Sequence, residues 1–196
     1  FYRTQIIKPT LNRVLKKEFK PEQSILHAGC GSGMVDTDVV ECFNITACDF
    51  SLEALTTYSN IHGVKAKAVH ADLFDTRFPK ASFDGLYNLG VMEHFVDLEM
   101  KSILSEFHRI LKPSGKIVLL WPPEFGLSVI FLKFAHYILN DVFGRKIQLH
   151  PPEPSRIQSK KQVMDLLTQN GFDMLNYEFG IRDLFTYVII TAQKID

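Results

Sequence analysis

The chain has 196 residues, a length that suits one domain with a full hydrophobic core, and we expect residues 1–196 to form a single domain. Hydrophobic residues make up 46% and charged residues 22%, which is ordinary globular usage and argues against disorder. The 22 Lys and Arg residues balance the 22 Asp and Glu residues, so the basic excess typical of nucleic-acid binding is absent and we expect no nucleic-acid partner.

Strands and helices are predicted to alternate along the first half of the chain. Apolar residues at helical spacing over residues 7–15 predict a helix that ends before Pro21. Between the strands we expect a helix over residues 34–43 and another that Ser51 caps. Short apolar runs predict four strands, over residues 24–28, 45–48, 66–71 and 83–89.

The second half continues this alternation. Residues 112–115 are typical of a turn and lead into a fifth strand over residues 116–121, and Ser159 with Gln162 predicts the capping box of a later helix. Behind a capping Asp97, one apolar stripe predicts the clearest helix, formed by Met100, Ile103, Leu104, Phe107, Ile110 and Leu111.

Two last strands are predicted over residues 173–179 and 184–193. The four residues between them are too few for a helical crossover, so these strands should pair antiparallel. The expected fold is α/β and Rossmann-like, with a mostly parallel sheet, an antiparallel C-terminal hairpin and helices on both faces.

A glycine-rich segment, Gly29-Cys30-Gly31-Ser32-Gly33, follows the first strand and is expected to open a helix. Small residues let a ligand approach the backbone, and a helix N-terminus offers free N–H groups to a negative group. A tight turn without a ligand is the alternative. Met34 stands where the dinucleotide-binding fingerprint has its third glycine, which argues against a nucleotide-dependent oxidoreductase.

Carboxylates follow the next two strands. Asp49 lies 20 positions after Gly29 and can accept hydrogen bonds from both hydroxyls of a ribose, or it caps the following turn. Asp72, with Leu73 beside it, is placed to accept a hydrogen bond from an adenine amino group, or it is a plain polar residue at a strand end. The carboxyl ends of parallel strands meet at one sheet edge, so this row of groups fits an adenosine with an attached carboxylate.

Six motifs occur in order along the chain, and they are Ile25 to Gly33, Cys48-Asp49-Phe50-Ser51, Ala71-Asp72-Leu73, Phe83-Asp84, Glu93-His94-Phe95 and Arg109 to Gly115. Together they resemble the motif series of class I S-adenosylmethionine-dependent methyltransferases, especially the small "type 11" group. The resemblance implies a seven-stranded sheet with its last strand inserted antiparallel. It also implies S-adenosyl-L-methionine as the cofactor and a small-molecule methyl acceptor.

The resemblance further implies roles by position. The three glycines would line the methionyl part, Asp49 the ribose, and Asp72 with Leu73 the adenine, while the strand end 88–90 would pass beneath the sulfonium. The expected cofactor-binding set is His27, Gly29, Cys30, Gly31, Gly33, Asp49, Phe50, Asp72, Leu73, Asn88, Leu89 and Gly90.

His27 departs from the resemblance, because the family usually has Asp or Glu there, and that acid helps to hold the ammonium end of the cofactor. A neutral histidine can still accept one hydrogen bond, so we expect binding to weaken without being lost. The departure leaves a non-catalytic, methyltransferase-like partner protein as an alternative function.

Methyl transfer from a sulfonium needs orientation more than a dedicated catalytic residue. A hydroxyl acceptor would benefit from a general base, for which His94 is the candidate; the interpretation that we prefer is a residue at a helix start, bonded to backbone. The other histidines and the three cysteines show no metal-ligand spacing, so we expect no metal. Sparse, odd-numbered cysteines and the lack of an apparent secretory leader predict a cytoplasmic location.

Residues 122–158 stand outside the alternation and are expected to form a lid or insertion. Apolar residues crowd the stretch 127–143, and Lys133, His136 and Asn140 make one narrow polar stripe. The apolar surface could pack on the sheet edge, line a hydrophobic acceptor pocket, pair two subunits or lie on a membrane surface. Monomer and homodimer, and peripheral membrane contact, therefore stay open, whereas no apolar run is long enough to span a membrane. The resemblance suggests acceptors of lipid, quinone or glycan pathways.

Overall fold

The computed structural model describes residues 2–126 and 154–195, which contain a seven-stranded sheet in the order β3-β2-β1-β4-β5-β7-β6. The first five strands run parallel, and β7 pairs antiparallel with both β5 and β6. The predicted sheet with its antiparallel C-terminal hairpin is therefore confirmed. The strands are β1 (Ser24–Ala28), β2 (Asn44–Asp49), β3 (Ala66–His70), β4 (Phe83–Leu89), β5 (Leu111–Trp121), β6 (Phe172–Glu178) and β7 (Val188–Lys194).

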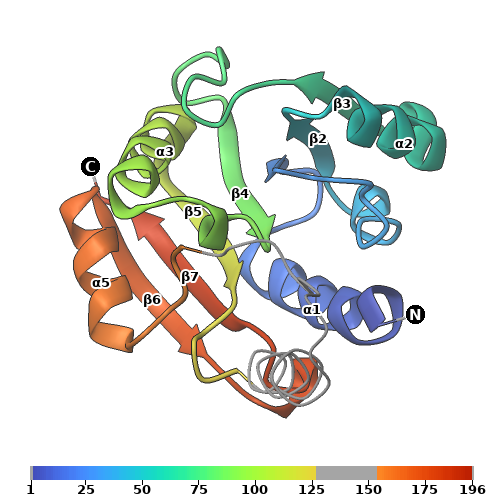
Figure 1. Ribbon diagram of the computed structural model, residues 1–196. Coiled ribbons are helices and arrows are strands. Elements are labelled where there is room, and N and C mark those ends of the chain that lie inside the picture. The colour runs from blue at the N-terminus through green and yellow to red at the C-terminus, as the bar shows by residue number, and fades with distance from the viewer. Residues whose placement is uncertain (1, 127–153, 196) are drawn as a thin grey trace, which may run out of the picture.

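Helices cover both faces of this sheet (Figure 1). Successive strand residues point to opposite faces, so Ile25 and Leu26 of β1 belong to two separate cores. Ile25 packs with apolar residues of α1, whereas Leu26 packs with those of α3 and α5. The α-helices are α1 (Lys8–Glu18), α2 (Leu52–His62), α3 (Asp97–Ile110) and α5 (Lys160–Gln169), and a π-helical turn, η1 (Arg3–Ile7), precedes α1.

The predicted helix over residues 34–43 is wrong. Only a 3-10 turn, η2 (Val39–Glu41), occurs in this range. The Asp36 side chain is buried and hydrogen-bonded to three aromatic side chains from β1, α2 and β4. These tertiary bonds hold the segment in turns, because side-chain hydrogen bonds to a short acidic residue compete with helical pairing. The glycine-rich segment thus opens no α-helix, and the expected helix N-terminus does not contribute to the site.

Two predicted helix caps differ in detail. Asp97 is not the cap of α3; the N-cap is Val96, whose N–H donates to Glu99 Oε2 at 2.9 Å. Ser159 does cap α5, and its Oγ accepts from the Gln162 N–H at 3.2 Å. The Gln162 side chain then accepts from the Gln158 N–H rather than closing the box on Ser159. The predicted cap of α2 is confirmed, because Ser51 Oγ accepts from the Ala54 N–H.

Two strand boundaries also move. The predicted turn 112–115 lies inside β5 as an irregularity, where the register against β4 passes from Phe83–Leu111 to Gly85–Lys116. β7 begins later than expected, because a 3-10 turn, η6 (Ile181–Asp183), and two residues at positive φ lengthen the connection.

The two ends of the insertion 122–158 lie side by side at the end of β5. Pro123 bridges Ile157, and the Trp121 Nε1–H donates to the Ser155 carbonyl at 2.8 Å. The Ser155 N–H donates to the carbonyl of Glu93, so the insertion starts and ends next to the turn that follows β4. Residues 127–153, which hold the predicted lid stripe, lie outside the described residues. Across the described ranges, no helix combines the length and apolar character needed to cross a membrane.

Candidate functional site

A cavity of about 570 Å³ opens at the carboxyl ends of β1, β2 and β4. Every member of the expected cofactor-binding set lines it except Asn88, and His94 lines it as well. The structure therefore brings together side chains that are up to 67 positions apart, from His27 to His94. Seven further lining residues were not in the expected set, and they are Arg3, Ser32, Met34, Val35, Phe74, Val91 and Phe95.

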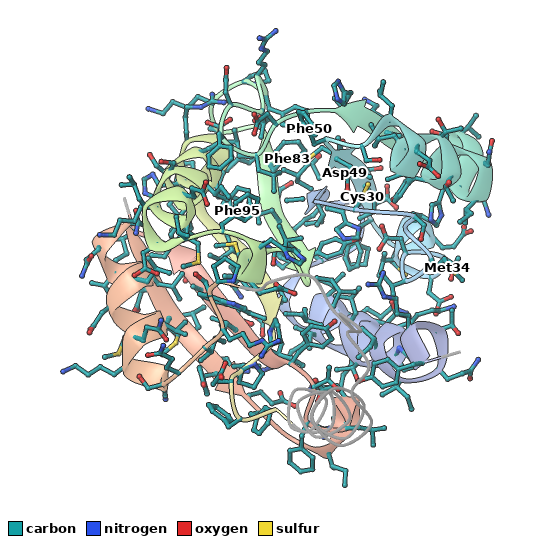
Figure 2. The ribbon with its side chains drawn as sticks, viewed as in Figure 1. Cys30, Met34, Asp49, Phe50, Phe83 and Phe95 are labelled. Carbon is teal, nitrogen blue, oxygen red and sulfur yellow. The ribbon has the colours of Figure 1, made fainter. Side chains whose placement is uncertain are left out.

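Figure 2 shows how the cavity is framed. Cys30, Asp49 and Phe50 lie near the ends of β1 and β2, and Phe95 lies across from them, beside α3. Phe95 belongs to the motif Glu93-His94-Phe95, which the sequence pattern had already indicated. Arg3 carries no such signal, because only the packing of η1 against the sheet brings it to the cavity.

The glycine-rich segment is closely packed at Gly29 and Gly33 and open at Gly31. Gly29, Gly31 and Gly33 all have positive φ values, of 71°, 52° and 65°. A Cβ on Gly33 would lie 2.2 Å from the Tyr58 ring, and one on Gly29 would lie 2.7 Å from Val91. A Cβ on Gly31 would meet no heavy atom within 4 Å. Gly29 and Gly33 are thus required by packing, whereas Gly31 leaves space for a ligand to approach the backbone.

Asp49 at the end of β2 holds the glycine-rich segment in place. Its Oδ2 accepts from the Gly31 N–H at 2.8 Å, and its Oδ1 accepts from the Ser51 N–H at 2.8 Å. The turn-capping alternative is therefore part of its role. Each carboxylate oxygen has a second acceptor position, so Asp49 can cap the turn and still accept hydrogen bonds from a ligand in the cavity.

Asp72 and its neighbours form the far wall beyond β3. Asp72 is exposed, and its Oδ1 accepts from the Phe74 N–H at 2.9 Å. Leu73 is buried, whereas the Phe50 side chain is 75% exposed at the mouth of the cavity. An exposed aromatic ring beside a carboxylate suits a flat heterocycle with an amino group, because the ring can stack and the carboxylate can accept.

The end of β4 forms the floor. Asn88 is fully buried beneath the cavity, and neither polar atom of its side chain has a hydrogen-bond partner in the described part of the chain. Leu89 and Gly90 do line the cavity. Gly90 has a φ of 68°, and a Cβ there would lie 3.2 Å from Glu93 Oε1. A carboxylate thus lies close to the strand end that faces the cavity.

His94 ends a 3-10 turn, η4 (Met92–His94), and its backbone N–H donates to the Val91 carbonyl. Its side chain is exposed and lines the cavity. The backbone bond fits the structural role, and the position of the ring also suits a proton acceptor for a group bound in the cavity.

His27 is buried and paired. Its Nδ1 lies 2.7 Å from Asp36 Oδ2, and its ring stacks on Tyr87 with centroids 4.2 Å apart. Burial by itself would raise the pKa of Asp36, but the neighbouring His27 and the hydrogen bonds from His27, Tyr87 and Tyr58 lower it. Asp36 is therefore an ionised carboxylate behind the histidine that replaces the expected acid.

The cavity lacks a reactive thiol. Burial, and then the nearby Asp49 carboxylate, raises the pKa of Cys30 far above the ordinary range. Within residues 2–126 and 154–195, no group of three or more His, Cys, Asp or Glu side chains is arranged to hold a metal ion.

Comparison with known proteins identifies the family. Residues 26–119 match the family model described as a methyltransferase domain. A sterol 24-C-methyltransferase of Aspergillus fumigatus is 30% identical over 169 residues, which cover 81% of this chain and 42% of that protein. The crystal structure of an S-adenosylmethionine-dependent methyltransferase from Methanosarcina mazei superposes with a TM-score of 0.71 at 19% identity, covering 93% of this chain and 97% of that one. The chain thus carries, over residues 26–119, the domain of the S-adenosylmethionine-dependent methyltransferases.

The methyltransferase resembles its relatives over different shares of their length. A ubiquinone/menaquinone biosynthesis C-methyltransferase of Campylobacter jejuni is 24% identical over 204 residues, which cover 91% of this chain and 83% of that protein. In contrast, the chain spans less than half of the Aspergillus protein. S-adenosylmethionine is the cofactor of this class. The cavity has open space at Gly31, and the carboxylates of Asp49 and Asp72 line it.

Proposed function

We propose that this methyltransferase transfers a methyl group from S-adenosylmethionine to a small, largely apolar acceptor. The observation that carries the proposal is the joint placement of Gly31, Asp49 and Asp72 on one cavity, with open space above Gly31. Asp49 would accept from the ribose hydroxyls, Asp72 from the adenine amino group, and the glycine-rich segment would contact the methionyl part.

The cofactor supplies a methyl group on a positively charged sulfur, and the protein supplies orientation. Holding two reacting groups in line can contribute about 7–11 kcal/mol of the barrier reduction. Leu89 and Gly90 offer a flat backbone floor, and Phe74 with Phe95 forms an edge-to-face pair at 5.5 Å on the wall. Aromatic walls exclude water and favour an apolar acceptor.

His94 is the proposed proton acceptor when the acceptor group is a hydroxyl. Replacing it by alanine should then lower turnover by about 10²- to 10⁴-fold with little change in cofactor affinity. Turnover and calorimetric affinity of His94→Ala, with the exposed Lys101→Ala as a matched control on α3, separate the two roles. A loss below about threefold would leave His94 with its backbone role alone.

Two relatives support the acceptor class. They are a sterol 24-C-methyltransferase and a ubiquinone/menaquinone biosynthesis C-methyltransferase. Ser155 in the insertion bonds the carbonyl of Glu93, whose neighbour His94 lines the cavity, and Pro123 pairs with Ile157, so we propose that residues 122–158 belong to the same domain and help to select the acceptor. The three cysteines are free, which fits the cytoplasmic location that we propose.

The direct experiment incubates the protein with S-adenosylmethionine labelled in its methyl group and with a panel of sterol, quinone and phenolic acceptors. We expect label in an organic-extractable product with at least one apolar acceptor, and none with Asp49→Ala. Cofactor binding without label transfer to any member of the panel or to components of a cell extract would favour the non-catalytic partner protein instead.

A further inference from the structure

Four side chains form a buried polar network behind the cavity. The Asp36 carboxylate is fully buried and is contacted by three side chains from three separate elements. His27 Nδ1 and the Tyr58 hydroxyl bond Oδ2 at 2.7 and 2.9 Å, and the Tyr87 hydroxyl donates to Oδ1 at 2.7 Å. A buried carboxylate is tolerated only when donors replace its hydration, and these three donors do so.

The network fixes the histidine ring. Nδ1 is held by Asp36, and the ring plane lies 25° from that of Tyr87 in a stacked arrangement. His27 also lines the cavity, and its ring bonds Asp36 through Nδ1 and not through Nε2. When Nδ1–H donates to the carboxylate, Nε2 presents its lone pair as an acceptor.

We propose that His27 and Asp36 act together as the ammonium-binding group of the site: Nε2 of a neutral His27 accepts a hydrogen bond from the cofactor's ammonium, and Asp36 supplies the negative charge. This inference rests on the proposed function. It assigns to Asp36, nine residues away in sequence, the charge that an acid at position 27 would otherwise carry.

The charges around the cavity favour an ammonium over a carboxylate at this position. A carboxylate placed beside His27 would lie near the ionised Asp36, which repels it. Arg3 also lines the cavity and offers a guanidinium for the carboxylate of an amino-acid group. The two ends of a zwitterion would thus have separate partners, with His27 and Asp36 for the cation and Arg3 for the anion.

The arrangement distinguishes between two kinds of ligand. A nucleoside that carries the amino-acid ammonium should gain affinity from His27 and Asp36, whereas a nucleoside without an ammonium should not.

The hydroxyl and thiol groups packed around His27 stay neutral near pH 7. Burial, and then the Asp36 charge, raises the pKa of Tyr58 and of Tyr87 far above neutrality. Burial likewise raises the pKa of Cys30. His62, which bonds the Gly33 carbonyl at 2.8 Å and lies against Tyr58, is the second imidazole near the network and needs its own control.

The experiment is calorimetric titration of the whole chain with S-adenosylhomocysteine near neutral pH. Methylthioadenosine, which has no ammonium or carboxylate, is the matched ligand control. We expect the wild-type protein to bind S-adenosylhomocysteine more tightly than it binds methylthioadenosine.

Variants locate the effect. Asp36→Asn removes the charge with little change of shape, and it should weaken S-adenosylhomocysteine at least about tenfold. Its affinity for methylthioadenosine should stay within about threefold, which shows that the site is still folded. Tyr58→Phe removes one hydrogen bond to the same carboxylate and keeps the charge, and His62→Gln removes the second imidazole. Both should bind S-adenosylhomocysteine nearly as tightly as the wild-type protein does.

The outcomes separate this inference from the proposed function. Equal weakening of both ligands by Asp36→Asn, or an Asp36→Asn protein with wild-type affinity for S-adenosylhomocysteine, would overturn the ammonium role. If wild-type protein binds methylthioadenosine and S-adenosylhomocysteine with equal affinity, the cofactor site stands and the inference fails. If it binds neither ligand, the proposed function itself fails.

Discussion

Asp49 is the residue on which most of the site depends, because it has two tasks. Its oxygens accept from Gly31 and Ser51 N–H groups, both at 2.8 Å, and its remaining acceptor positions are available to a ribose. Hydrogen bonds to a charged group contribute about 1.5–3 kcal/mol each. Asp49→Ala should therefore lower the affinity for S-adenosylhomocysteine by at least about tenfold.

Calorimetry on Asp49→Ala, with Glu53→Ala on the exposed side of α2 as its control, measures this loss. Asp49→Asn keeps one acceptor oxygen and should lie between the two in affinity. Equal affinity of Asp49→Ala and wild type would leave this carboxylate with its turn-capping role only.

The cysteines differ in reactivity because the thiolate is the nucleophile. Burial is the main cause that raises the pKa of Cys30, and it raises that of Cys48 to about 12. Cys42 is only partly buried. At about pH 8, a disulfide reagent should modify Cys42 and leave the other two largely unmodified. Thiol counting before and after denaturation checks this, and rapid loss of three thiols in the native protein would contradict it.

Some site residues could be read from the sequence and others could not. Asp49, Asp72 and the glycines follow predicted strands, and parallel strands bring their ends to one edge, so their meeting was predictable. Asp36 was missed because it lies inside a stretch with a helical pattern. Its role depends on hydrogen bonds from Tyr58 and Tyr87, which are distant in sequence, and no local pattern predicts these contacts.

At the scale of elements, the glycine-rich segment offers a matched pair of substitutions. Gly33→Ala would place a Cβ against the Tyr58 ring at 2.2 Å, whereas Gly31→Ala meets no atom within 4 Å. Both residues have positive φ, so both alanines bear the same backbone strain, about 1–2 kcal/mol. Gly33→Ala should lower the midpoint of thermal unfolding further than Gly31→Ala does.

Cofactor affinity should show the opposite order for the folded variants. Gly31→Ala projects a methyl group into the space through which a ligand approaches, and it should weaken S-adenosylhomocysteine while leaving the fold nearly intact. Thermal unfolding and calorimetry on the two variants test both statements. A Gly31→Ala protein with wild-type affinity would mean that the ligand does not contact this part of the backbone.

The elements themselves were largely predictable, and the exceptions have physical causes. Strand positions followed from short apolar runs, and the final hairpin followed from a connection too short for a crossover. The predicted helix over residues 34–43 failed because the buried Asp36 takes its hydrogen bonds from distant side chains. A local helical pattern cannot compete with a fully bonded buried carboxylate.

At the scale of the whole molecule, the apolar stretch 127–143 should decide the association state. Its sequence is apolar over most of the helical circumference, and an exposed surface of that kind would drive association. Ser155, which follows this stretch, bonds the carbonyl of Glu93 next to the cavity-lining His94, so we propose that the stretch helps to select the acceptor and that the protein is a monomer. Phe131→Glu and Phe134→Glu should then impair acceptor use or folding without changing the association state.

Light scattering and vesicle sedimentation on wild type and the two variants check this proposal. A stable wild-type dimer that Phe131→Glu converts to a monomer would place the stretch at a subunit interface. Release of the wild-type protein from lipid vesicles by the same charge would place it on a membrane surface. Either outcome would contradict the arrangement that we propose.

The central claim is that the cavity at the ends of β1, β2 and β4 binds S-adenosylmethionine, and one titration tests it most directly. Wild-type protein is titrated with S-adenosylhomocysteine in the calorimeter, with a reduced nicotinamide dinucleotide as the competing ligand class. We expect saturable binding of S-adenosylhomocysteine that Asp49→Ala weakens at least about tenfold, and no binding of the dinucleotide. A folded protein that binds the dinucleotide and not S-adenosylhomocysteine would contradict the claim.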